Sequence, residues 1–145
     1  MGRTIHIPRP AQLNRTLETE PSMQATQPKQ LVLMLAHNAN DDRSTVAFTI
    51  AGAALSTGME VAIFLTSDGV ELGRDQACEF TSITPFMPLG DLIEGFVEKG
   101  GVLWTCAPCF QHRGMDVDDI VEGNVVTGAG QLIEWVSNGA ATICL

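Results

Sequence analysis

The feature that most constrains the fold is a pair of short, continuous apolar segments, Leu31–Ala36 and Val61–Leu65. Segments of this length without polar alternation are typical of strands that are covered on both faces. Between them, Thr45–Thr57 places apolar side chains at helical spacing, and Gly58 is a suitable residue for the end of that helix. Two buried strands joined by a helix form a parallel βαβ unit. The sequence therefore predicts an α/β fold.

The rest of the chain continues the alternation of strands and helices. Asp91 can cap a second helix, with Glu94 placed for a capping-box contact. Three further strands are predicted at Val102–Thr105, Val125–Thr127 and Ala141–Leu145. A short helix is predicted at Gln131–Ser137, before the last strand. We expect an open, mostly parallel five-stranded sheet with the strand order 2-1-3-4-5 and helices on both faces.

The chain is long enough for one domain, because 145 residues with 45% apolar content suffice for a single buried core. Residues 1–29 hold four of the seven prolines without apolar periodicity, so we expect a tail or arm followed by a domain at residues 30–145. No apolar run approaches the roughly 20 residues that a membrane-spanning helix needs. The first residues lack the pattern of a secretory signal, so we expect a cytoplasmic protein that does not enter membranes.

The charge is distributed unevenly along the chain. Residues 1–29 hold four basic and two acidic side chains, whereas residues 30–145 hold four basic and 15 acidic ones. An acidic domain repels phosphate groups, and four scattered cations cannot form a basic patch. We therefore expect no direct binding of nucleic acid or of anionic membranes.

Several reactive or polar side chains follow the predicted strands directly. The first strand leads to His37 and Asn38, the second to Thr66 and Asp68, and the third to Cys106 and Cys109. Ligands of open parallel sheets bind beyond the carboxyl ends of the strands, near the point where the strand order reverses. With the order 2-1-3-4-5, His37 would lie between Asp68 and Cys106.

Cys106 is the strongest candidate for a catalytic residue. Pro108 is tolerated in the first turn of a helix, so a helical turn can begin right after Cys106 and stabilise its thiolate. His112 or Arg113 would add to that effect, and Cys109 completes a CxxC pair. A thiolate that attacks a sulfane sulfur can hold the atom as a persulfide and pass it to a second thiolate.

Four motifs together resemble the DsrE/DsrF-like family, which includes the TusD-like sulfur-relay proteins, over roughly residues 30–145. They are Ala47–Val61, Phe64–Val70, Gly101–Cys106 and the downstream pair Arg113-Gly114. The resemblance implies a flavodoxin-like sheet and a persulfide on Cys106. It also implies assembly as a homotrimer or homohexamer, with sulfur donor and acceptor proteins as partners and no cofactor.

Two other functions stay open beside sulfur relay. Cys109 makes a CxxC motif that the TusD-type loop lacks, which is compatible with a thiol–disulfide redox protein. A non-catalytic assembly or regulatory module is the third possibility. With His112 the pair offers three zinc ligands, but a structural site needs four, so no metal is predicted. We expect Cys78 to have only a packing role and Cys144 to belong to the core.

Overall fold

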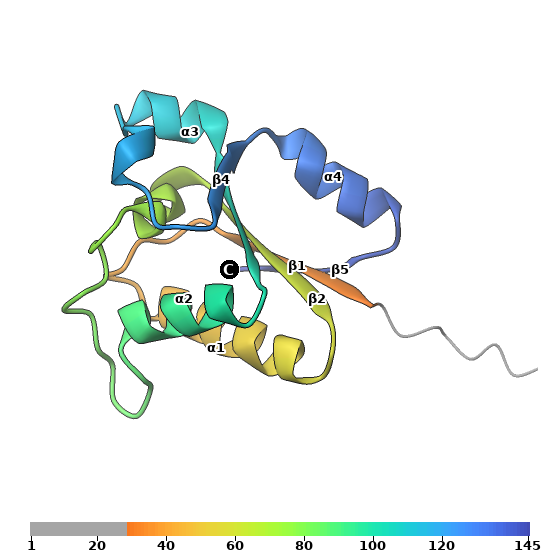
Figure 1. Cartoon of the computed structure of the whole chain (residues 1–145), viewed down its shortest axis with the longest axis horizontal. Coiled ribbons are helices and arrows are strands. Elements are labelled where there is room, and N and C mark those ends of the chain that lie inside the picture. The colour runs from red at the N-terminus through yellow and green to blue at the C-terminus, as the bar shows by residue number, and fades with distance from the viewer. Residues whose placement is uncertain (1–28) are drawn as a thin grey trace, which may run out of the picture.

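The computed structural model describes residues 29–145, which form one parallel sheet with helices around it (Figure 1). The tail predicted at residues 1–29 lies outside this range except for its last residue. The strands are β1 Gln30–Leu35, β2 Glu60–Leu65, β3 Val102–Cys106, β4 Asn124–Thr127 and β5 Ala141–Cys144. The helices are α1 Asp42–Ser56, α2 Leu89–Glu98, α3 Ala107–His112 and α4 Ala129–Ser137, with the 3-10 segments η1 Ser67–Gly73 and η2 Val117–Asp119.

All four strand pairings are parallel, so the predicted α/β class and five-stranded parallel sheet are confirmed. In the central pair Leu31 lies opposite Val61 and Leu35 lies opposite Leu65, so the two apolar segments are in register. Both segments are buried on each face of the sheet, as their lack of polar alternation indicated.

The predicted strand order 2-1-3-4-5 is wrong, because the order in the sheet is β4-β3-β2-β1-β5. From β1 the chain moves steadily outward through β2 and β3 to β4, and only its last crossover returns to the other side of β1. Right-handed crossovers that run in one direction place their helices on one face, and a crossover that runs back places its helix on the other. This geometry puts α1 and α2 together and α4 opposite them (Figure 1).

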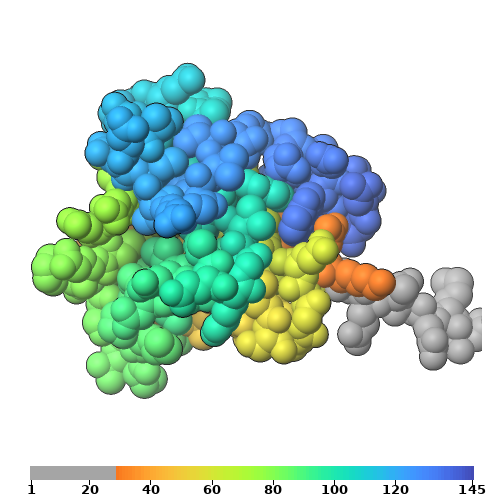
Figure 2. Space-filling view, in the orientation of Figure 1, coloured from red at the N-terminus to blue at the C-terminus, as the bar shows by residue number. Residues whose placement is uncertain are grey.

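An edge-to-face pair of aromatic rings packs on each face of the sheet. On the α1–α2 face, Phe48 meets Phe96 edge to face with ring centroids 5.8 Å apart. On the α4 face, Trp104 of β3 meets Trp135 of α4 at 5.1 Å in the same geometry. Figure 2 shows the two helical layers as separate regions of surface, yellow to green on one side and blue on the other. The prediction of helices on both faces is confirmed.

Two local predictions differ from the structure. Asp91 does not cap α2, since the helix begins at Leu89 behind Pro88 and no side chain caps it. Asp91 instead lies in the first turn, where a carboxylate suits the positive end of the helix. Cys144 is exposed rather than in the core, because β5 is an edge strand whose alternate side chains face outward.

Within residues 29–145, no helix combines the length and the apolar character needed to cross a bilayer.

Candidate functional site

The two cysteines of the CxxC motif lie where β2 and β3 end side by side. β2 continues through Thr66 into η1, and β3 ends at Cys106, immediately before α3. Because β2 and β3 are neighbours in the sheet, α3 packs on η1, as Figure 1 shows. The site is therefore built from the ends of adjacent strands and not at a reversal of strand order.

The sulfur of Cys109 contacts polar groups of the turn that follows β2. It accepts a hydrogen bond from the Ser67 backbone N–H at 3.4 Å, and the Thr66 hydroxyl lies 3.7 Å from it. The pKa of the Cys109 thiol is below its ordinary value, chiefly because the Cys106 thiol acts as a hydrogen-bond partner of this sulfur. Partial burial opposes the shift, whereas Ser67, Thr66 and the positive charge of Arg113 add to it. These contacts favour a thiolate on Cys109.

The turn after β2 is held in the shape that aims the Ser67 N–H at Cys109. Ser67 has a positive φ of 51°, which is uncommon for a residue with a side chain. The turn is tied to β1, because Thr66 N donates to Leu35 O at 2.9 Å and Gly69 N donates to Ala36 O at 3.2 Å. A Cβ on Gly69 would collide with the Leu35 carbonyl, so only glycine allows this close approach.

Cys106 occupies the position that the sequence predicted, directly after a buried strand and before a helical turn. Pro108 lies in the first turn of α3, as expected. Cys106 is half-buried and contacts the hydrophobic clusters on both sides of the sheet. Its thiol is free, like that of Cys109. The persulfide role of Cys106 stays a prediction.

Arg113 and Asp68 meet beside the two thiols. Arg113 Nη2 lies 2.5 Å from Asp68 Oδ1, and Arg113 Nη1 donates to the Cys109 carbonyl at 3.5 Å. The Arg113 side chain is 22% exposed and that of Asp68 67% exposed, so the guanidinium group is the more enclosed partner. Arg113 therefore connects η1 to the end of α3 and keeps a positive charge close to Cys109. The neighbouring His112 is exposed, and no hydrogen bond joins it to these groups.

His37 and Asn38 form a separate group at the end of β1. His37 Nδ1 lies 3.3 Å from Asp41 Oδ2, and Asn38 Oδ1 accepts a hydrogen bond from Asn40 N at 3.0 Å. Hydrogen bonds from the Arg43 side chain hold the pKa of Asp41 well below its usual range. The expectation that His37 lies between Asp68 and Cys106 is wrong, since the end of β2 separates β1 from β3.

Sequence reasoning placed Thr66 at the end of the second strand but missed Ser67, and these two residues contact the Cys109 sulfur. The position of Ser67 between Thr66 and Asp68 was a signal of the same kind that selected Asp68. Their partnership with Cys109 depends on β2 lying next to β3, which the predicted order did not have.

The other two cysteines lie away from the pair. Cys78 is buried, and burial raises the pKa of its thiol to about 11, which agrees with the predicted packing role. Among residues 29–145, no group of three or more His, Cys, Asp and Glu side chains is arranged to hold a metal ion.

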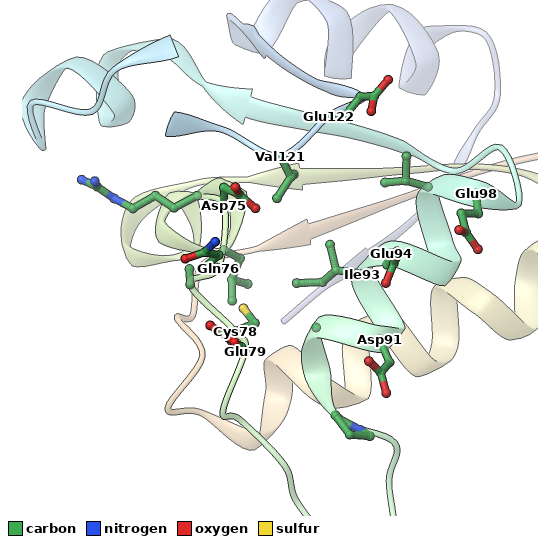
Figure 3. Close-up of a pocket in the computed structure, with 17 residues that line it drawn as sticks. Asp75, Gln76, Cys78, Glu79, Asp91, Ile93, Glu94, Glu98, Val121 and Glu122 are labelled. Carbon is green, nitrogen blue, oxygen red and sulfur yellow. The ribbon is translucent and has the colours of Figure 1, made fainter. Parts of the chain in front are cut away.

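A pocket with a volume of about 720 Å³ lies elsewhere in the described chain. Figure 3 shows it between α2 and the segment that follows η1, and neither Cys106 nor Cys109 lines it. Its floor is apolar and includes Ile93 and Val121. Its rim carries the carboxylates of Asp75, Glu79, Asp91, Glu94, Glu98 and Glu122. The half-buried thiol pair is therefore not part of this pocket.

Comparison with known proteins shows a family by sequence and similar folds by structure. The family model described as "DsrE/DsrF-like family" matches residues 29–145. The uncharacterized protein MK0008 of Methanopyrus kandleri is 33% identical over 95 residues, which are 66% of this chain and 75% of that protein. The uncharacterized protein MJ0760 of Methanocaldococcus jannaschii is 28% identical over 98 residues, 68% of this chain but only 36% of that longer protein.

Among solved structures, the ychN protein from E. coli has a similar fold, with a TM-score of 0.68 at 14% identity. The match covers 81% of this chain and 99% of the ychN chain. A family model that spans the whole described domain shows the family that the four motifs indicated. The chain belongs to the DsrE/DsrF-like family.

Proposed function

We propose that this protein is a sulfur carrier, or sulfurtransferase, which holds sulfane sulfur as a persulfide on Cys106. The observation that carries the proposal is the place of Cys106, which ends β3 directly before α3, with Cys109 one helical turn later. Membership of the DsrE/DsrF-like family supports it at the level of the family.

The two thiols divide the work of sulfur uptake. The pKa of Cys109 is lowered, so in this step the Cys109 thiolate takes the proton of Cys106 while Cys106 Sγ attacks the outer sulfur of a donor persulfide R–S–SH. The new bond joins Cys106 Sγ to that sulfur, and the donor leaves as R–S⁻. The products are Cys106–S–SH and a neutral Cys109 thiol.

Delivery reverses these steps with another partner. An acceptor thiolate attacks the outer sulfur of the Cys106 persulfide and leaves with it, and Cys109 returns its proton to Cys106. No cofactor enters either step. Arg113 lies at the pair through its bond to the Cys109 carbonyl, so its charge favours the state in which one of the two sulfurs is anionic. The sulfur donor and the sulfur acceptor would be proteins that present their own cysteine. We place the protein in the cytoplasm, where a reducing environment keeps cysteines such as these four as free thiols.

A homotrimer or homohexamer is part of the proposal. Apolar side chains on β4 and α4 are exposed in the single chain, namely Val125 (52%), Ile133 (59%) and Val136 (39%). Apolar surface of this kind is typical of contacts between subunits. Light scattering coupled to gel filtration would give the subunit number, and a monomer at micromolar concentration would contradict this part of the proposal.

The sulfur-carrier role is tested by intact-mass spectrometry. The reduced chain, in a Cys144→Ser background that removes the exposed thiol, is incubated with a persulfide donor at low temperature and analysed at short times. We expect a gain of about 32 Da, the mass of one sulfur atom, that disappears in Cys106→Ser. A chain that takes up no sulfur, or a Cys106→Ser variant that takes up as much as its parent, would overturn the proposal.

A further inference from the structure

The two thiols have a second possible reaction once Cys106 carries sulfur. We propose that this site is also a sulfane-sulfur reductase: Cys109 attacks the inner sulfur of the Cys106 persulfide, forms an intramolecular disulfide and releases hydrogen sulfide. This inference rests on the proposed function, because it begins from the persulfide on Cys106.

The first support is the fixed position of Cys109. Its sulfur is held by the Ser67 N–H at 3.4 Å and lies 3.7 Å from the Thr66 hydroxyl, in a turn that is tied to β1. The nucleophile is therefore placed by groups outside its own helix. Since Cys106 ends β3 and Cys109 lies one helical turn later, the sheet and α3 hold both partners at the same place.

The second support is the enclosure of the persulfide by its neighbour. Cys106 is half-buried, so an external thiol must approach its outer sulfur from the open side of the site. Cys109 lies in the first turn of α3, three residues after Cys106, which is the CxxC spacing at which thiol–disulfide enzymes close their disulfide. Arg113 is bonded to the Cys109 carbonyl and to Asp68, which restricts movement of this turn away from Cys106.

The reaction balances without any further group. After Cys109 loses its proton to solvent, Cys106–S–SH and Cys109–S⁻ give the Cys106–Cys109 disulfide and HS⁻. The bond between Cys106 Sγ and the sulfane sulfur breaks, and the bond between the two cysteine sulfurs forms. The sulfane sulfur is reduced by two electrons that the two cysteines supply. A dithiol, from a protein or a small molecule, then reduces the disulfide and restores both thiols.

The persulfide on Cys106 therefore has two competing reactions, transfer to an acceptor thiolate and attack by Cys109, and the faster one decides the product. An acceptor bound at the site takes the outer sulfur, and the protein acts as a carrier. Without an acceptor, Cys109 attacks the inner sulfur and the stored sulfur leaves as sulfide. The substrate class of the second reaction is a persulfide, and its co-reactant is a dithiol.

A single-turnover experiment tests this inference. The reduced full-length chain with Cys144→Ser is freed of reductant and given one equivalent of glutathione persulfide, and sulfide and intact mass are followed over time. We expect close to one sulfide per chain and a final mass about 2 Da below that of the reduced chain, as a disulfide requires. Cys109→Ser, and Cys109→Ala as a second variant, should take up sulfur more slowly because they lack the group that accepts the Cys106 proton, but once loaded they should release no sulfide and keep the added mass of about 32 Da.

The outcomes separate the two proposals. If the parent chain keeps a stable persulfide and releases no more sulfide than Cys109→Ser, the reductase inference is overturned and the carrier role stands. Equal sulfide release from the parent and from both Cys109 variants also overturns it. If neither the parent nor the Cys109 variants ever gain sulfur, the proposed function itself fails.

Discussion

Gly69→Ala is the substitution that most directly tests how the fold builds the thiol site. Gly69 lies in η1, and its Cα is so close to the Leu35 carbonyl that an added Cβ would overlap the oxygen. The obstacle is backbone and cannot rotate away. Leu35 O also accepts the hydrogen bond from Thr66 N at 2.9 Å, which holds the start of the turn. The added methyl group must therefore push η1 away from β1.

The cost follows from these contacts. Forcing a methyl group into a packed site costs about 1–3 kcal/mol, and losing the Thr66–Leu35 hydrogen bond costs about 1 kcal/mol more. We expect the free energy of unfolding to fall by about 2–4 kcal/mol. With a slope of about 2 kcal/mol per molar urea, the midpoint of unfolding should fall by about 1–2 M. The same displacement moves the Ser67 N–H away from Cys109, so the pKa of Cys109 should rise toward its ordinary value.

Two measurements on one sample check both effects. Urea unfolding followed by circular dichroism gives the stability, and the pH dependence of iodoacetamide labelling, read at the Cys109 peptide, gives the thiol acidity. Gly95→Ala is the matched control, because its Cβ would meet nothing within 4 Å in the middle of α2, and it should stabilise the chain by up to about 1 kcal/mol. A Gly69→Ala chain that is as stable as the parent, with unchanged Cys109 labelling, would refute this account of the site.

Three further predictions concern single contacts. The pKa of Cys109 is lowered and labelling needs the thiolate, so the rate of Cys109 labelling should rise with pH and level off below the usual range for cysteine. In Cys106→Ala this rise should move to higher pH, because Cys106 contributes most to the lowered pKa. An unmoved profile would contradict that contribution. Asn124 is buried, accepts a hydrogen bond from Thr105 at 2.9 Å and donates to Gly73 O at 3.4 Å, so Asn124→Ala should lower the free energy of unfolding by about 1–3 kcal/mol in urea titrations, and an unchanged midpoint would count against that network. Leu33 is fully buried in the central strand, and Leu33→Ala should cost about 2–5 kcal/mol by the same measurement, so a loss below 1 kcal/mol would show that the core collapses around the gap.

The classes of structure followed from local patterns that do not depend on the rest of the chain. Leu31–Ala36 and Val61–Leu65 are short and apolar without alternation, which is typical of strands inside a covered sheet, and the segment between them has the spacing of a helix. Cys106 could be placed at a strand end for the same reason, since the apolar run before it stops there.

The capping of α2 and the exposure of Cys144 could not be settled in this way. A carboxylate suits both the cap and the first turn of a helix, and the choice depended on Pro88 starting α2 earlier. Whether an alternating strand is half-covered or open depends on its place in the sheet, and β5 lies at an edge.

The sequence by itself determined that this is a parallel α/β protein with a CxxC pair at the end of a strand, because apolar runs and helical spacing are patterns of residues that are close in the sequence. Only the tertiary structure decided what surrounds that pair. The order β4-β3-β2-β1-β5 brings Thr66 and Ser67 to Cys109 and leaves His37 with Asp41. The physical reason is that strand order is set by the packing of whole layers and the handedness of each crossover, and no local pattern of side chains records which strands become neighbours.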